Sequence, residues 1–183
     1  MKKYLIFLKW FIKNPIRNAS IIPSSKYLIK NMTEWLNFDK INVIVELWPW
    51  IWSFTEEVIK KSKENTLLIL IELNNDYCKY LKKKYWNKIN ILNVSATDMK
   101  NSLENLWINK IDLIICWLWL VSMPKEIRDS VLAQSYNYIK DWAEFRGFTY
   151  MPKILKNAFP NYKIKLINHT FKNFPPAFVY SVI

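Results

Sequence analysis

Apolar runs alternate with amphipathic stretches along the first 150 residues of the chain. The apolar runs are short and rich in Ile, Leu and Val, which is typical of strands buried on both faces of a sheet. The stretches between them carry apolar residues at helical spacing, with capping residues or prolines near their ends. The pattern predicts strands at 41–47, 66–73, 89–94, 111–116 and 143–150. It predicts helices at 3–12, 25–36, 53–61, 75–85, 98–106 and 124–139.

Strands that alternate with helices indicate βαβ units and a parallel sheet. Two further strands are predicted at 162–171 and 177–183, and the link between them is too short for a helical crossover, so they must be antiparallel. We therefore expect an α/β fold of the Rossmann-like kind. Its sheet would have seven strands, mostly parallel, with a C-terminal antiparallel hairpin and helices on both faces. The length suits one domain over 1–183, with a helical cap at 1–38 and the core at 39–183.

The composition contains one glycine and ten tryptophans, whereas roughly a dozen glycines are usual for this length. Trp48 follows an apolar strand, Trp86 ends a lysine-rich helix, and Trp142 lies in a turn between a helix and a strand. Such places require positive φ or close backbone approach, which glycine provides. We hypothesise that UGA codons read as glycine in the host have been translated as tryptophan. Trp35 is the least clear case, and a genuinely tryptophan-rich protein is the alternative.

The formal net charge is +12, and residues 1–31 contain seven basic residues and no acidic one. This predicts a polyanionic partner, either an anionic membrane surface or nucleic acid. A lysine-rich composition inherited from an AT-biased genome is the alternative.

His169 is the only histidine and there are two cysteines, so we expect no metal site. No apolar run reaches the ~18 residues of a membrane span, and we expect a cytoplasmic protein, peripheral on the inner face of the membrane.

The residues that could bind a ligand lie where the first three predicted strands end. Read with glycine for tryptophan, residues 46–52 become a glycine-rich turn between a strand and a helix, where a ligand can approach the backbone. Ser53 and Glu56 have the spacing of a capping box for that helix. Glu72 ends the second strand, where a carboxylate accepts hydrogen bonds from ribose hydroxyls. Asp98 follows the third strand and could accept from an adenine amino group. A solvated strand end for Glu72 and a helix cap for Asp98 are the structural alternatives.

The block from Glu46 to Ser53, together with Glu72 and Asp98, resembles three successive motifs of S-adenosylmethionine-dependent methyltransferases. Four flanking segments resemble the bacterial phospholipid N-methyltransferases: 7–25, 116–124, 148–152 and 173–177. Position 119 departs from that pattern, because Trp119 stands where proline is expected. The related rRNA adenine dimethyltransferases carry an Asn-Leu-Pro-Tyr-like motif after the fourth strand, and this chain has neither Asn nor Tyr there.

The resemblance implies S-adenosylmethionine as cofactor, with Glu46 near its methionine end. The cofactor-binding residues it implies are Glu46, Leu47, Trp48, Trp50, Trp52, Glu72, Leu73, Asp98 and Cys116. Candidates for the wall of the acceptor pocket are Ser122, Tyr150 and Asn173. No catalytic base is assigned, since methyl transfer mainly requires alignment of donor and acceptor.

Three functions remain open on the sequence. The first is N-methylation of the amine head group of phosphatidylethanolamine-type phospholipids, with the basic N-terminal helix in the membrane interface. The second is N-methylation of adenine in rRNA or another nucleic acid. The third is a degenerate, non-catalytic methyltransferase fold, which gains weight if the indoles at 48, 50 and 52 are genuine. The sequence leaves the oligomeric state open.

Overall fold

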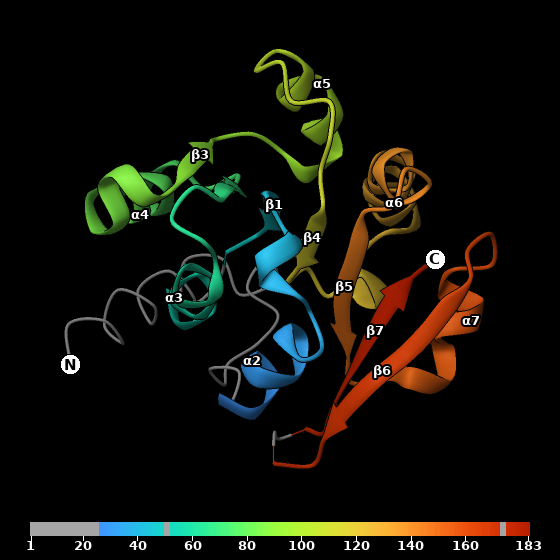
Figure 1. Cartoon of the computed structure of the whole chain (residues 1–183). Helices are drawn as coiled ribbons and strands as arrows, with labels where there is room; N and C mark the ends of the chain where they lie inside the picture. The colour runs from blue at the N-terminus through green and yellow to red at the C-terminus, as the bar shows by residue number, and fades with distance from the viewer. Residues whose placement is uncertain (1–25, 50–51, 173–174) are drawn as a thin grey trace.

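A computed structural model describes residues 26–49, 52–172 and 175–183. Its centre is a seven-stranded sheet with the strand order β3-β2-β1-β4-β5-β7-β6 (Figure 1). β1 to β5 are parallel to their neighbours, and β7 is antiparallel to both β5 and β6. The strands are β1 Val43–Leu47, β2 Leu67–Ile71, β3 Asn90–Leu92, β4 Leu113–Cys116, β5 Glu144–Thr149, β6 Ile164–Thr170 and β7 Ala177–Val182. The predicted Rossmann-like architecture, including its antiparallel hairpin, is confirmed.

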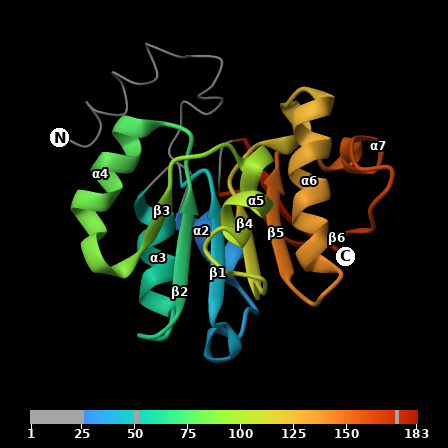
Figure 2. The same ribbon diagram turned by 90° about the horizontal axis from the view of Figure 1, so that it is seen from above.

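Helices cover both faces of the sheet, and each face has its own apolar cluster (Figure 2). One cluster joins the sheet to α5, α6 and α7, and the other joins the opposite face to α2, α3 and α4. The α-helices are α2 Lys26–Thr33, α3 Trp52–Lys61, α4 Asn75–Tyr85, α5 Met99–Glu104, α6 Lys125–Ile139 and α7 Leu155–Ala158. The short 3-10 helices are η1 Phe38–Lys40, η2 Trp86–Lys88, η3 Ala96–Asp98, η4 Leu120–Ser122 and η5 Pro152–Ile154. Strands buried on both faces explain the unbroken apolar runs in the sequence.

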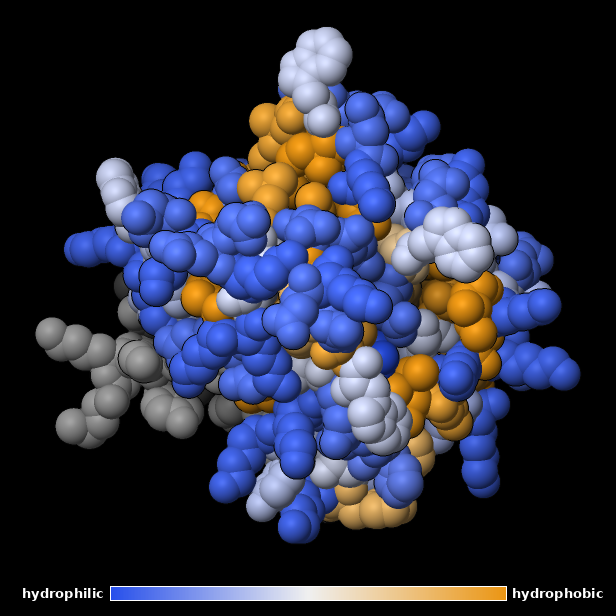
Figure 3. All heavy atoms as spheres, in the orientation of Figure 1, coloured by the Kyte–Doolittle hydropathy of each residue, from blue (hydrophilic) through white to orange (hydrophobic). Residues whose placement is uncertain are grey.

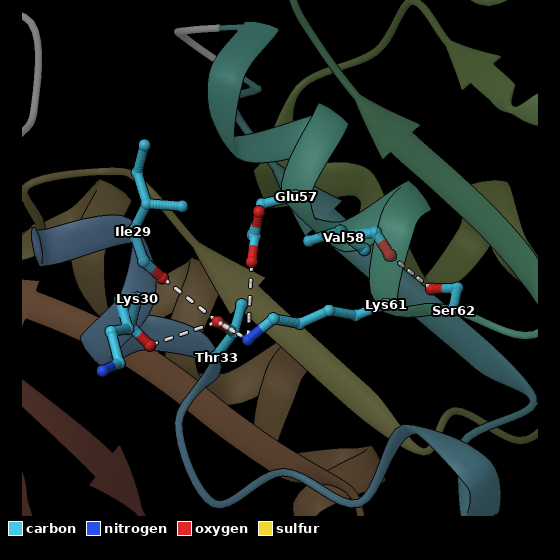
Figure 4. A network of polar contacts seen from close by, with 7 residues as sticks. All are labelled: Ile29, Lys30, Thr33, Glu57, Val58, Lys61 and Ser62. Carbon is cyan, nitrogen blue, oxygen red and sulfur yellow. Dashed lines mark hydrogen bonds and ion pairs between the residues drawn. The ribbon is translucent and has the colours of Figure 1, made fainter. Parts of the chain in front are cut away.

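A polar contact connects α2 to α3 (Figure 4). The ammonium of Lys61 donates to the hydroxyl of Thr33 at 2.8 Å and lies 3.5 Å from the carboxylate of Glu57. Thr33 itself lies within hydrogen-bond distance of carbonyls in the preceding turn of α2. α2 also packs against β6, β7 and β5, so the helix spans the antiparallel end of the sheet.

Two predicted helices differ from the structure at their ends. α2 ends at Thr33 rather than near Leu36, because Trp35 has φ of 62° and leaves the helical region. The predicted 98–106 helix begins instead as the 3-10 turn η3 and becomes α-helical only over 99–104. The predicted helix at 3–12, and most of the proposed 1–38 cap, lie outside the described residues.

Left-handed backbone is the most unusual feature of the fold. In the described part of the chain, every non-glycine residue with positive φ is a tryptophan. The angles are 62° at Trp35, 57° at Trp48, 39° at Trp86, 60° at Trp107 and 82° at Trp142. The expected left-handed backbone at Trp48, Trp86 and Trp142 is confirmed. A side chain with a Cβ in this region costs roughly 1–2 kcal/mol per residue relative to glycine.

Four of these tryptophans follow helix ends, where glycine is the usual residue. After α6, the Ala143 amide donates to the Tyr138 carbonyl, closing a Schellman motif around Trp142. After α5, the Ile108 amide donates to the Leu103 carbonyl and closes the same motif around Trp107. These hydrogen bonds satisfy carbonyls at the helix ends, and they form only if the residue between is left-handed.

The single glycine serves a different purpose. Gly147 lies in β5 opposite Tyr180 of β7, and a Cβ at position 147 would lie 2.7 Å from the Tyr180 ring. Tyr180 is fully buried between Phe145 and Phe159, so its ring has no free space to move into. Glycine is therefore required here for space rather than for φ.

Replacing Trp35, Trp86, Trp107 and Trp142 singly by glycine is expected to raise the free energy of unfolding by about 1 kcal/mol at each position. The four side chains are 73% to 94% exposed, so little packing is lost when they are removed. Chemical denaturation of the purified variants measures the change.

Alanine at the same four positions is the matched control, since it removes the indole but keeps a Cβ in the left-handed region. Alanine variants should be less stable than the glycine variants. Equal stability of the two series would show that φ at these positions has no energetic consequence.

Candidate functional site

The candidate site is the edge of the sheet where β1, β2 and β4 end. The register pairs Leu47 with Ile71 on one side and with Cys116 on the other. Because the strands are parallel, the residues that follow them meet at one edge. Glu46, Glu72 and Trp117 are thereby brought together from three separate segments of the chain.

Glu46 is a completely buried carboxyl group on β1, which lies between β2 and β4. It accepts a hydrogen bond from the Thr55 hydroxyl at 3.0 Å and another from the Trp117 indole N–H at 2.8 Å. Burial raises its pKa to about 7, and these two hydrogen bonds counteract the rise. A buried carboxyl group needs such partners, because an unpaired one is costly to desolvate.

Trp117 fills the space beside Glu46. Its indole stacks on the Phe54 ring with centroids 3.6 Å apart and is only 3% exposed. Its backbone amide donates to the Leu47 carbonyl and extends the β1–β4 pairing by one residue. Glu46, Phe54 and the position of Trp117 thus form one continuous region next to the turn after β1.

Glu72 directly follows β2 and is 3% exposed. Its Oε1 accepts from the Asn74 amide at 2.7 Å, whereas its Oε2 is buried and makes no hydrogen bond to the described residues. Burial raises the pKa of this carboxyl group to about 7. A buried acceptor without a donor is the arrangement that a ligand hydroxyl would satisfy.

The turn after β1 begins with left-handed backbone. The Trp48 amide donates to the Ile71 carbonyl at 2.9 Å, so the turn is held against the end of β2. Trp50 and the side chain of Trp52 lie outside the described residues, and Trp52 begins α3.

The structure begins α3 at Trp52, one residue before the Ser53 predicted to cap it, and the side chain of Ser53 lies outside the described residues. Glu56, its expected partner, instead pairs with Lys84 of α4. Thr55 lies on the inner side of the helix and binds Glu46, as described above. The first turn of α3 is therefore connected to the site through Thr55.

The remaining predicted cofactor residues differ in exposure. Leu47 and Cys116 are fully buried, and burial raises the pKa of the Cys116 thiol to about 12. Leu73 is 58% exposed beside Glu72. Asp98 is exposed and accepts from the side chains of Asn101 and Ser102 in the first turn of α5. In this structure the Asp98 carboxylate therefore supports that turn.

The candidate acceptor residues lie after β4 and β5. Tyr150 contacts Trp119 and Phe148 edge to face, with centroids 5.5 Å from each. Ser122 is exposed and donates to the Trp119 carbonyl at 2.9 Å. Asn173 lies outside the described residues. An aromatic wall at this end of the site is thus formed by residues from two strand ends.

Thr55 and Trp117 were not identified from the sequence as partners of Glu46. Thr55 is nine residues from Glu46 and Trp117 is 71 residues away. The only indication in the sequence that either residue belongs to the site was the position of Trp117 directly after a buried strand.

No group of three metal-binding side chains gathers within residues 26–49, 52–172 and 175–183. None of the helices in these ranges is long and apolar enough to cross a membrane.

Comparison with known proteins gives one similar curated sequence and many similar folds. No family model matches the chain. An ornithine lipid N-methyltransferase from Singulisphaera acidiphila is 23% identical over 98% of this chain and 95% of its own length. An O-methyltransferase from Bacillus cereus, solved in complex with SAH, has a TM-score of 0.62 at 11% identity over 94% of this chain and 88% of its own.

A precorrin 8w decarboxylase from Methanobacterium thermoautotrophicum has a TM-score of 0.65 at 8% identity, over 90% of this chain and 94% of its own. The architecture of the chain is thus that of the S-adenosylmethionine-dependent methyltransferases. The chain is also a distant homologue of a methyltransferase along nearly its whole length.

The raised pKa values make stability depend on pH in a defined direction. The pKa of Glu46 and of Glu72 is about 7 in the folded chain, whereas the ordinary pKa of a glutamate carboxyl group is 4.5. The folded state therefore binds more protons, and the free energy of unfolding falls as pH rises from about 4.5 to about 7. Replacing Glu46 with glutamine should remove roughly 3 kcal/mol of this fall, since the amide does not ionise.

Urea unfolding at pH 5 and pH 8 measures this difference. The Glu46→Gln variant should be more stable than the parent at pH 8 and similar to it at pH 5. Glu57→Gln is the control, because the Glu57 carboxylate is partly exposed and pairs with Lys61, and it should leave the pH dependence unchanged. A Glu46→Gln variant with the parent's pH dependence would contradict the buried, neutral carboxyl group.

Proposed function

We propose that the chain transfers the methyl group of S-adenosylmethionine to the amine of a membrane lipid head group. Phosphatidylethanolamine is the first candidate acceptor, from the resemblance to bacterial phospholipid N-methyltransferases. The similar protein from Singulisphaera acidiphila is named for another amine-bearing lipid, ornithine lipid. Since the similarity covers 98% of this chain, it supports a shared reaction class: N-methylation of a lipid amine.

The observation that carries the use of this donor is the Glu72 carboxyl group. Its Oε2 is buried without a hydrogen-bond donor, directly beside the turn that follows β1. A ribose hydroxyl provides the missing donor. The residues present at this edge of the sheet therefore fit the nucleoside part of S-adenosylmethionine.

We assign the following roles to the residues of the site. Glu72 holds the ribose hydroxyls, Glu46 faces the methionine end, and the backbone at positions 48–52 approaches the cofactor closely. Asp98 is proposed to accept from the adenine amino group, since its exposed carboxylate keeps acceptor capacity beside its bonds from Asn101 and Ser102. The cofactor supplies a methyl group on a positively charged sulfur, which a neutral amine attacks in line with the departing sulfur.

Alignment and exclusion of water are the main contributions expected of the protein. Ser122, Tyr150 and Asn173 are proposed to line the acceptor side, where Tyr150 already packs against Trp119 and Phe148. The amine must lose its proton before it attacks, and no residue of the chain is assigned as the base. The basic N-terminal segment is proposed to contact anionic lipid at the membrane surface.

We further propose that the tryptophans at left-handed positions are glycines in the native protein. Two independent observations support this. The sequence has one glycine and ten tryptophans, and the positive-φ residues among the described ones are all tryptophans. A genuinely tryptophan-rich chain has no reason to place indoles at helix ends, where a Cβ is disfavoured.

Glycine also changes the site. With glycine at 117, the space now filled by the indole beside Glu46 and Phe54 becomes free, and Glu46 loses one of its two donors. With glycine at 48, 50 and 52, only Pro49 and Ile51 keep side chains in the turn where the cofactor would lie. The chain as printed is therefore expected not to bind S-adenosylmethionine.

Full-length protein with glycine at all ten tryptophan positions is expected to transfer labelled methyl groups to a lipid amine. The assay offers phosphatidylethanolamine vesicles, ornithine lipid vesicles and RNA side by side. Label in either lipid supports the proposal and identifies the acceptor. Label in RNA alone would replace it with nucleic-acid methylation, and the printed chain should transfer nothing.

At pH 8, where the Glu72 carboxyl group is ionised, Glu72→Gln in the glycine protein should weaken S-adenosylmethionine binding by about 10- to 100-fold, because a charge-assisted hydrogen bond to the ribose is lost. Calorimetry measures the affinity. Glu57→Gln is the control, since Glu57 pairs with Lys61 on the α2 side of the helix. Unchanged affinity in Glu72→Gln would disprove the assigned donor site.

Peptide masses from the protein made in its native host test the recoding. Peptides that contain positions 35, 86, 107 and 142 should each be lighter by the difference between tryptophan and glycine. Peptides around Gly147 serve as the internal control, as that glycine is already written as glycine. Tryptophan masses at the four positions would refute the reassignment.

A further inference from the structure

The turn between β6 and β7 lies at the same edge of the sheet as the candidate site. β7 runs antiparallel to β5, and Phe178 near the start of β7 pairs with Thr149 at the end of β5. The turn therefore extends beyond the carboxyl ends of the parallel strands (Figure 1). A surface that contacts this turn would also face the acceptor side of the site, where Tyr150 lies.

The turn exposes an aromatic ring. Phe171 is 71% exposed, although it directly follows a buried residue, Thr170. Its ring packs edge to face against His169, with centroids 5.0 Å apart, and more distantly against Phe178. These neighbours hold Phe171 in position, and most of its surface still faces outward.

Two cationic groups lie over the Tyr27 ring, and one of them belongs to the residue that follows Phe171. Lys172 follows Phe171, and its ammonium lies 4.8 Å from the centre of the Tyr27 ring at the start of α2. The Lys26 ammonium lies 5.4 Å from the same centre. Both lysines are exposed. Residues 1–25, which join α2 at Lys26, include five basic residues and no acidic one.

An exposed aromatic ring beside exposed lysines fits the interface of an anionic bilayer. The ring enters the region between head groups and acyl chains, and the lysines contact lipid phosphates. On the face shown in Figure 3, hydrophilic residues predominate and apolar residues form separate patches. An isolated ring at a turn would then be a local insertion point rather than part of a broad apolar face.

We propose that Phe171, Lys172 and Lys26 form a bilayer contact that brings the acceptor side of the site to the membrane surface. This contact rests on the proposed lipid methylation, because it explains how a protein reaches an amine that stays in the bilayer. It adds a specific docking element to the basic N-terminal segment. The partner is an anionic phospholipid surface, and both an apolar and an electrostatic contribution are expected.

The test is co-sedimentation with vesicles of phosphatidylcholine and phosphatidylglycerol, without any methyl donor. Full-length protein with glycine at all ten tryptophan positions is used, as in the methyl-transfer assay, because the exposed indoles of Trp35, Trp86, Trp107 and Trp142 would themselves bind the interface. Phe171→Ser should weaken vesicle binding about tenfold at any salt concentration. Lys172→Gln should weaken it about fivefold at low salt and less at high salt.

Matched controls lie at the opposite edge of the sheet. Ile183→Ser removes an apolar residue that is 58% exposed after β7, and Lys88→Gln removes an exposed charge before β3. Both should bind vesicles as the parent does. Equal loss in the controls, or unchanged binding of Phe171→Ser and Lys172→Gln, would overturn the contact.

The failure of this contact and that of the proposed function can be distinguished. Phe171→Ser should keep the parent's affinity for S-adenosylmethionine, and it should keep the rate on a short-chain, water-soluble lipid amine. It should lose rate on the same head group in vesicles. Equal rates in vesicles for parent and variant would overturn the docking role and leave the methyl transfer intact.

Discussion

Left-handed backbone at a few turns is the constraint on which this structure depends. α2, α4, α5 and α6 each end at or shortly before a residue with positive φ, and the turn after β1 begins with one. These residues reverse the chain so that the next strand enters the sheet in register. Only glycine adopts that conformation without strain, and each of these positions is written as tryptophan. The proposed glycine at these positions accounts for both the backbone conformation and the anomalous composition.

The buried carboxyl groups are the second organising feature. Glu46 lies within β1 and Glu72 directly after the neighbouring β2, and burial raises the pKa of both to about 7. Glu46 is satisfied by Thr55 and Trp117, while Glu72 keeps one oxygen without a donor. A chain that buries two acids at one sheet edge loses stability near neutral pH. This loss is characteristic of a site arranged for a ligand.

The antiparallel hairpin connects the site to the outside. Because β7 pairs with β5, the β6–β7 turn lies at the edge where the parallel strands end. The exposed ring of Phe171 and its neighbouring lysines are consequently on the acceptor side. Methyl donor, lipid amine and bilayer contact would all lie at one edge of the sheet, as chemistry on a lipid head group requires.

The sequence by itself determined the order of strands and helices, the antiparallel hairpin and the acids at two strand ends. Periodicity and loop length depend on local spacing, so they can be read along the chain. It also indicated left-handed backbone at Trp86 and Trp142, since helix ends have local signals.

Only the tertiary structure decided the partners of those acids. Trp117 and Thr55 bind Glu46 because parallel pairing and helix packing bring distant segments together, and no spacing rule encodes that. The structure also showed that α3 begins before Ser53, that Asp98 supports α5, and that Trp35 and Trp107 are left-handed. These features depend on contacts across the sheet and between neighbouring turns, which are formed when the chain is folded.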